Sequence, residues 1–172
     1  MNTIAQRLGI TAPVTPLLMK VRRLARGMAV VPWLVETANV RGFNAVQRSG
    51  EGSGAGANLE TLSNEELAMA FLLPGLEDEP QSLRLGAQII SRGAAETSAL
   101  LSIAAREGAL RILAGLAAQA LKAAPTHAAW NTIAAATAGE RPLRGNLIHW
   151  TRLAEPVMQF RGPHTGEWRL VA

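Results

Sequence analysis

Short apolar segments separated by glycine and proline are the feature of this sequence that most restricts its fold. Between residues 62 and 139, apolar side chains recur every three or four positions, with interruptions by glycine or proline at positions 74–75, 93, 108, 125 and 139. This spacing places apolar side chains on one face of a helix, and glycine and proline are typical of helix ends. The pattern therefore predicts a compact bundle of about five short helices in residues 58–139.

Local signals give the expected helix boundaries. Ser63 and Glu66 have the spacing of a capping box, which predicts a first helix that ends before Pro74. The acidic run at residues 77–79 and Pro80 predict the start of a second helix that ends at Gly93. Further helices are expected at 94–107, 109–123 and 126–138. The segment 109–123 is the most apolar, so it is expected to lie at the centre of the bundle or against a partner.

The regions on either side of this bundle differ from it in composition. Residues 49–57 contain four alternating glycines, separated by serine, alanine and Glu51, which indicates a linker, since no helix start follows as a dinucleotide-binding loop would require. After residue 140 a turn and a short helix near 146–153 are expected. The segments 157–161 and 167–171 then flank a loop with Gly162 and Pro163, which predicts a small β-hairpin in the extension 140–172.

Positive charge is concentrated in residues 1–48. This segment contains Lys20 and six arginines against a single acid, Glu36, whereas the rest of the chain has ten basic and twelve acidic residues. Apolar residues at helical spacing, from Leu17 to Met28 on one face, predict a helix over 17–30, with Pro32 ending or bending it. The sequence as a whole thus predicts a mainly α-helical protein: a helical bundle with a C-terminal β-hairpin and a basic, partly helical N-terminal arm.

The basic arm supplies the candidate binding residues Arg22, Arg23, Arg26 and Trp33. Arginine forms bidentate contacts with carboxylates and phosphates, and tryptophan and arginine are common anchors of protein interfaces. Trp33 lies among apolar neighbours, so its segment is expected to dock on the chain's own body or on another chain, with stacking on a nucleobase as a further alternative.

No residue pattern indicates catalysis, a metal site or a cofactor. The chain has no cysteine, and none of His127, His149 and His164 is paired at the spacing of metal ligands. The only aspartate, Asp78, lies in an acidic run that suits a helix start, and no serine lies in a G-x-S-x-G motif. The sequence therefore predicts a protein that is not an enzyme.

These observations favour a non-enzymatic adaptor or assembly subunit that binds a protein partner or forms a homo-oligomer. The alternative is a nucleic-acid-binding protein that contacts phosphates through its arginines, and an anionic membrane surface is a third hypothesis. The apolar stretch after Arg22 and Arg23 is too short and too late in the chain for a signal peptide, and a mitochondrial presequence would be richer in serine. No apolar run is long enough to span a membrane, so a cytoplasmic location is expected.

Overall fold

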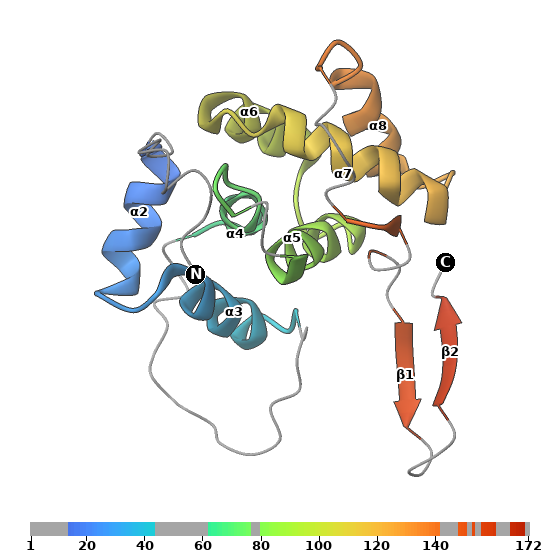
Figure 1. The fold of residues 1–172 in the computed structure, drawn as a ribbon, viewed down its shortest axis with the longest axis horizontal. Coiled ribbons are helices and arrows are strands. Elements are labelled where there is room, and N and C mark those ends of the chain that lie inside the picture. The colour runs from blue at the N-terminus through green and yellow to red at the C-terminus, as the bar shows by residue number, and fades with distance from the viewer. Residues whose placement is uncertain are drawn as a thin grey trace, which may run out of the picture.

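The computed structural model of this chain is mainly helical, as predicted (Figure 1). It describes residues 14–43, 62–76, 80–141, 148–150 and 153, together with the backbone of residues 156–160 and 166–170. Strands β1 (Pro156–Phe160) and β2 (Gly166–Leu170) pair antiparallel. Seven helices occur within these ranges: α2 (Pro16–Ala25), α3 (Val30–Val40), α4 (Asn64–Phe71), α5 (Pro80–Ser91), α6 (Thr97–Glu107), α7 (Leu110–Ala123) and α8 (Ala128–Ala136).

The five helices expected in residues 58–139 are present as α4–α8, and the helix count is higher than expected because the basic segment forms two helices, α2 and α3, where one was predicted. The predicted linker at 49–57, the acidic run at 77–79 and the hairpin loop at 161–165 lie outside the described residues. The longest described helix, α7, has 14 residues, and none of the described helices is long and apolar enough to cross a membrane.

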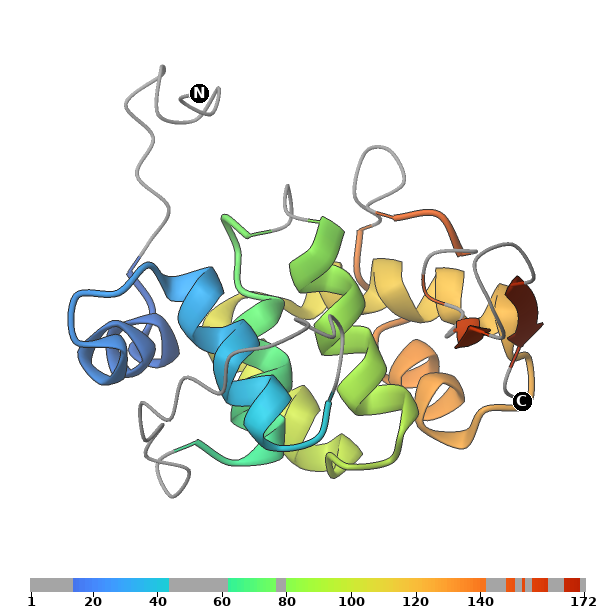
Figure 2. The same ribbon diagram turned by 90° about the horizontal axis from the view of Figure 1, so that it is seen from below.

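Helices α4 and α5 lie at the centre of the helical body (Figure 2). Residues 67–73 and 85–90 are all buried, and α4 contacts α2, α3, α5 and α6. The sequence predicted that the segment 109–123 lies at the centre of the bundle or against a partner; α7 is not central, since it keeps Arg111, Ala118 and Lys122 exposed. Leu67–Phe71 of α4 are all buried, so this helix is covered on every side, whereas α7 buries one face that includes Ile112, Leu113 and Leu116.

The single helix predicted over 17–30 is wrong, because the structure has two helices there. Helix α2 ends at Ala25, and Arg26 and Gly27 follow with left-handed backbone angles, φ 47° and 90°. Helix α3 then begins at Val30 and has Pro32 in its first turn. Proline is tolerated there because the first N–H groups of a helix have no partner within it, so Pro32 lies inside a helix and does not end one.

Other boundaries follow the local signals. The Ser63 hydroxyl accepts a hydrogen bond from the Glu66 N–H at 3.1 Å, and the Ser63 N–H donates to Glu66 Oε2 at 3.0 Å, which confirms the capping box. Gly108 ends α6 in the left-handed conformation, φ 69°. Glycine adopts this conformation without steric cost, which explains why α6 ends where the sequence predicts.

Gly86 allows α4 and α5 to approach each other closely. A Cβ atom at this position would lie 2.7 Å from Cγ and Cδ2 of Leu72 and 3.0 Å from the carbonyl oxygen of Ala68. We expect Gly86→Ala to lower the free energy of unfolding by about 1–2 kcal/mol, because the overpacking outweighs the better helix propensity of alanine. Equilibrium urea denaturation followed by circular dichroism measures this change.

Gly139→Ala is the matched control, because a Cβ atom there has no neighbour within 4 Å. Its effect is expected to stay within about 0.5 kcal/mol. A Gly86→Ala variant as stable as the native chain would contradict the close approach of α4 and α5.

Candidate interaction surface

Helix α2 has one buried and one exposed face. Leu17, Val21 and Ala25 are buried in the hydrophobic core, where they recur every four residues. The opposite face exposes Met19, Arg22, Arg23 and Arg26, and Met28 is exposed in the turn that follows. We call these five residues, Met19, Arg22, Arg23, Arg26 and Met28, the α2 surface. Helix α2 lies at one end of the helical body, away from α8 (Figures 1 and 2).

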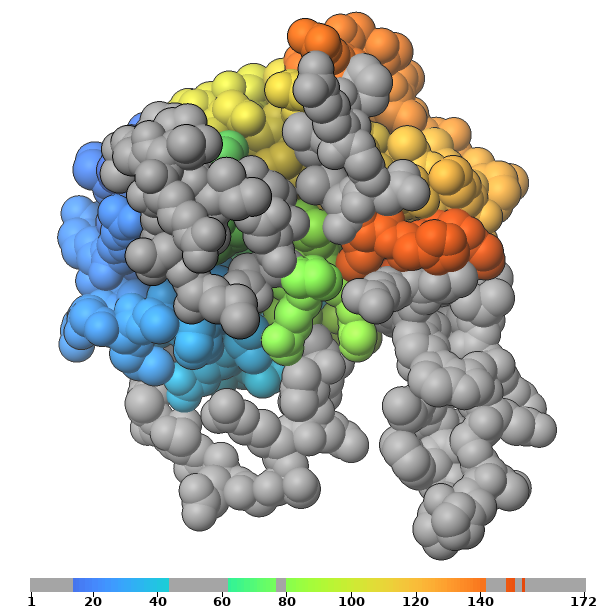
Figure 3. Space-filling view, in the orientation of Figure 1, coloured from blue at the N-terminus to red at the C-terminus, as the bar shows by residue number. Residues whose placement is uncertain are grey.

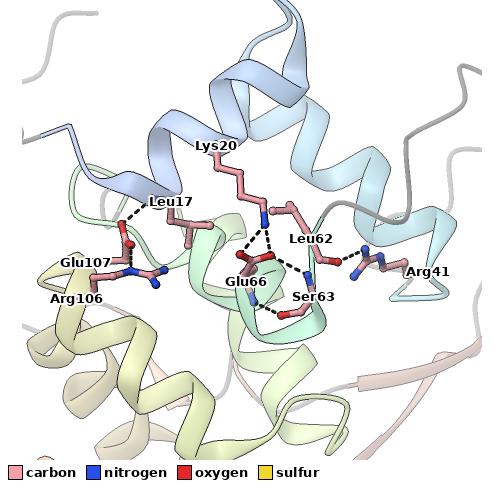
Figure 4. Close-up of polar contacts among 8 residues, drawn as sticks. All are labelled: Leu17, Lys20, Arg41, Leu62, Ser63, Glu66, Arg106 and Glu107. Carbon is pink, nitrogen blue, oxygen red and sulfur yellow. Dashed lines mark hydrogen bonds and ion pairs between the residues drawn. The ribbon is translucent and has the colours of Figure 1, made fainter.

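Lys20 attaches α2 to α4. Its Nζ lies 2.7 Å from both carboxylate oxygens of Glu66, the residue that also completes the capping box of α4 (Figure 4). The ion pair is only partly exposed, with about a third of the Lys20 side chain accessible. Lys20 therefore has a structural role within the chain, and its charge is neutralised by Glu66.

Arg41, which follows the last residue of α3, attaches that helix to the start of α4. Its guanidinium group donates to Oδ1 of Asn64 at 3.0 Å and to the carbonyl oxygen of Leu62. Arg92 reaches the same region from the other side, with a hydrogen bond of 3.1 Å to the carbonyl oxygen of Gly42. These contacts use a second cation of the basic segment, Arg41, to hold α3 against the start of α4.

Glu107 holds the N-terminal end of α2. Its fully buried side chain accepts a hydrogen bond from the Leu17 N–H at 3.1 Å and lies 2.9 Å from Nε of Arg106 (Figure 4). Burial by itself raises the pKa of Glu107, but hydrogen bonds from the Thr15 hydroxyl, Arg106 and the Leu17 N–H outweigh it and hold the pKa below its ordinary value. A carboxylate from the end of α6 thus caps a helix from a distant part of the sequence.

The three arginines of the α2 surface have no such partners. No hydrogen bond or ion pair joins the side chain of Arg22, Arg23 or Arg26 to any residue that the structure describes. Their positive charges lie near the C-terminal end of α2, where the helix dipole favours cations. In the space-filling view the atoms of α2 form an edge of the molecule (Figure 3). The surface therefore presents three guanidinium groups that are available to an external anion.

Trp33, the fourth predicted binding residue, is buried in the core and is not part of the α2 surface. Trp33 lies in α3, is 8% exposed and belongs to the hydrophobic core cluster. Its segment was expected to dock on the body or on another chain, and within this structure the tryptophan packs on the chain's own body. The burial follows from α3 itself, whose inner face comprises Trp33, Leu34, Thr37 and Ala38.

The two methionines of the α2 surface were not among the predicted site residues. Met28 was expected on the apolar face of a helix over 17–30, but α2 ends at Ala25 and leaves it 49% exposed. Met19 is 59% exposed and lies three residues before Arg22, on the same face. Its helical spacing from the arginines is visible in the sequence and could have identified it.

His127 has a structural role. His127 caps α8: its Nδ1 accepts the Trp130 N–H at 3.5 Å, and its Nε2 lies 2.9 Å from the carbonyl oxygen of Ser91. The hydroxyl of Ser91 accepts a different bond, from Nε1 of Trp130 at 2.9 Å. His127 is therefore hydrogen-bonded to the backbone of Ser91, which gives no Ser–His pair of the kind that activates a nucleophile.

Glu65 and Glu96 are neighbouring carboxylates, but both are used as acceptors. Glu65 accepts the Glu96 N–H at 2.8 Å, and Glu96 caps α6 by accepting from Ser98 and Ala99. The hydrogen bonds from Ser98 and Ala99 lower the pKa of Glu96. Across the described ranges no group of three acidic, histidine or cysteine side chains is arranged to hold a metal ion.

Comparison with models of protein families, with characterised proteins and with solved structures gives no match to this chain. The chemistry of the α2 surface must therefore be read from its own residues. It combines three exposed cations, no neutralising acid among the residues that α2 itself contributes, and two exposed methionines.

Proposed function

We propose that this protein is a non-enzymatic interaction module that binds a protein partner on the α2 surface, as an adaptor or assembly subunit of the cytoplasm. The observation that carries the proposal is the set of three guanidinium groups on one exposed helix face, without partners among the described residues. The absence of catalytic motifs from the sequence remains the basis for expecting no enzymatic activity.

The way in which α2 is attached supports a docking role. Buried apolar residues, the Lys20–Glu66 ion pair and the Glu107 cap all hold the inner side of the helix. The outer side is therefore presented on a fixed support, which lowers the entropy lost on binding. Arginine binds carboxylates in a bidentate manner and sheds its hydration more readily than lysine, so such a face suits an acidic protein partner.

Nucleic acid is the second candidate that the sequence left open, and two observations favour a protein instead. Tight binding to a phosphate backbone uses many cations, about six to ten contacts in well-studied cases. Of the cations on α2 and α3, Lys20 and Arg41 are engaged within the chain, and the tryptophan that could stack on a base, Trp33, is in the core. A membrane surface is disfavoured because the apolar face of α2 is buried.

A triple substitution tests the proposal. R22Q/R23Q/R26Q removes the three charges but keeps side chains of similar length and helix propensity. Tagged native and variant chains are used to capture proteins from a nuclease-treated extract of the native host, and captured proteins are quantified by mass spectrometry. We expect a defined set of proteins to be retained by the native chain and reduced at least about tenfold by the variant.

R84Q/K122Q/R141Q is the matched control, because it removes the same charge from exposed positions outside the α2 surface. It is expected to retain the native set. Equal loss in the two triple variants would mean that net charge, and not the α2 surface, drives capture. Capture that nuclease abolishes would contradict a protein partner and favour nucleic acid.

A further inference from the structure

We infer that the α2 surface binds an acidic amphipathic helix of the protein partner, with Arg26 as its main affinity-determining residue. The inference rests on the proposed function and adds the chemistry of the partner segment. Such a segment carries carboxylates one helical turn apart and an apolar side chain beside them.

The spacing of the arginines matches a helical partner. Arg22 and Arg23 lie in the last turn of α2 and Arg26 directly follows its last residue, four and three positions later, so the charges are separated by about one helical turn, roughly 5 Å along the helix axis. Acidic residues three or four positions apart on another helix have the same repeat. Each carboxylate can then pair with one guanidinium group through two hydrogen bonds.

The methionines explain why the partner is expected to be amphipathic. Met19 lies one turn before Arg22 and Arg23, and Met28 lies just beyond Arg26, so exposed apolar groups stand at both ends of the charged row. Methionine is flexible and polarisable, and it is common on surfaces that bind apolar side chains. The sugar–phosphate backbone of a nucleic acid offers phosphates to the arginines but no large apolar group to cover the methionines, whereas an amphipathic helix offers both carboxylates and apolar side chains.

The backbone singles out Arg26 among the three arginines. Its angles, φ 47° and ψ 43°, lie in the left-handed region, and it is the only residue other than glycine with positive φ in the part of the chain described. Glycine is the usual residue at such a helix end, since other side chains are strained there. An arginine that reduces stability at an exposed position is expected to be retained for binding.

The test uses the full chain and synthetic probes. One peptide of about 20 residues places glutamates and leucines at helical spacing, a second has the same composition in scrambled order, and a DNA duplex is the third probe. Fluorescence anisotropy measures the affinity of the native chain for each. We expect the patterned peptide to bind at least about tenfold more tightly than the scrambled one.

Arg26→Gly separates binding from folding. We expect it to raise the midpoint of thermal unfolding by about 3 °C, because the strain is relieved, and to weaken the patterned peptide about tenfold or more. If Arg26 had only a capping role, the variant would be more stable and would bind the peptide with native affinity.

The double variant M19S/M28S is expected to lower the affinity for the patterned peptide about fivefold and to leave the affinity for DNA unchanged. Val40→Ser, at a comparably exposed position on α3, is expected to change neither affinity.

The outcomes distinguish the inference from the proposed function. If Arg26→Gly binds the patterned peptide with native affinity while R22Q/R23Q/R26Q loses it, the special role of Arg26 is overturned. The α2 surface would then still be the binding site. Native affinity in R22Q/R23Q/R26Q overturns both proposals. Equal binding of the two peptides, no binding of either, or tighter binding of the duplex overturns the amphipathic helix as the partner.

Discussion

Replacing Trp130 with alanine is expected to lower the free energy of unfolding by about 3–5 kcal/mol, the range for truncation of a large buried aromatic side chain. Trp130 is 1% exposed and is the largest side chain that α8 contributes to the core. Helix α8 contacts α5, α6 and α7, so the cavity would open where three helices meet it. A loss of this size is a large fraction of the 5–15 kcal/mol that stabilises a typical domain.

The indole N–H adds a polar component to this effect. Nε1 of Trp130 donates to the Ser91 hydroxyl at 2.9 Å, which links α8 to the end of α5. We expect Trp130→Phe to retain much of the packing and to lose about 1–2 kcal/mol, partly because this hydrogen bond is removed. Urea denaturation followed by circular dichroism measures both variants without relying on tryptophan fluorescence.

Thr132→Ala is the control on the same helix, because Thr132 is exposed. Its effect is expected to stay within about 0.5 kcal/mol. If Trp130→Ala changed the stability no more than this control, α8 would not be packed as the structure describes.

Glu107→Gln is expected to lower the stability at neutral pH by about 2 kcal/mol, as for the loss of hydrogen bonds to a charged group. The amide of glutamine would present N–H donors to a site that already contains three donors, from Leu17, Thr15 and Arg106. The consequence is a weaker attachment of the N-terminal end of α2. Helix α2 is expected to lose amide hydrogen-exchange protection before the rest of the chain.

The effect depends on pH in a definite direction. The pKa of Glu107 is lower in the folded chain than its ordinary value of 4.5, so its contribution is present above that value and is lost as the pH falls through the folded pKa. The stability difference between native chain and Glu107→Gln should therefore be largest near neutral pH and shrink in acid. Glu65 and Glu96 also have lowered pKa values, so acid unfolding of the native chain reports on all three carboxylates. The difference in stability between the native chain and Glu107→Gln reports on Glu107 alone.

Glu36→Gln is the control for this experiment, since the Glu36 side chain, on α3, forms no hydrogen bond or ion pair with the residues described. Its stability should follow that of the native chain across the same pH range. A Glu107→Gln variant whose deficit stayed constant down to acidic pH would show that the carboxylate charge plays no part.

Several features of the fold could be predicted from the sequence because they depend on neighbouring residues. The capping box needs only Ser63 and Glu66, three residues apart, and a helix end at Gly108 needs only a residue that tolerates positive φ. The exposure of Arg22 and Arg23 follows from their placement opposite Leu17 and Val21 on one helix. These are local effects, and the sequence contains them in full.

Which basic residues form structural contacts could not be predicted from the sequence, because these contacts join distant segments of the chain. Lys20 is neutralised by Glu66, 46 positions away, and Glu107 accepts the N–H of Leu17, 90 positions away, beside the local N-cap Thr15 of α2. The sequence pattern singled out Arg22, Arg23 and Arg26 as binding residues, but it gave no sign that Lys20 and Arg41 hold α2 and α3 against the start of α4. Only the packing of α2 against α4 and α6 distinguishes the cations that hold the fold from those that remain exposed.

By itself, the sequence determined that this protein is mainly helical, where most of its helices begin and end, and that its positive charge lies near the N-terminus. The tertiary structure alone decided that residues 16–40 form two helices joined to the core, that Trp33 is buried, and that α4 rather than α7 is central. The physical reason is the range of the interactions. Helix starts and ends are set within a few residues, whereas burial and ion pairing depend on which helices become neighbours.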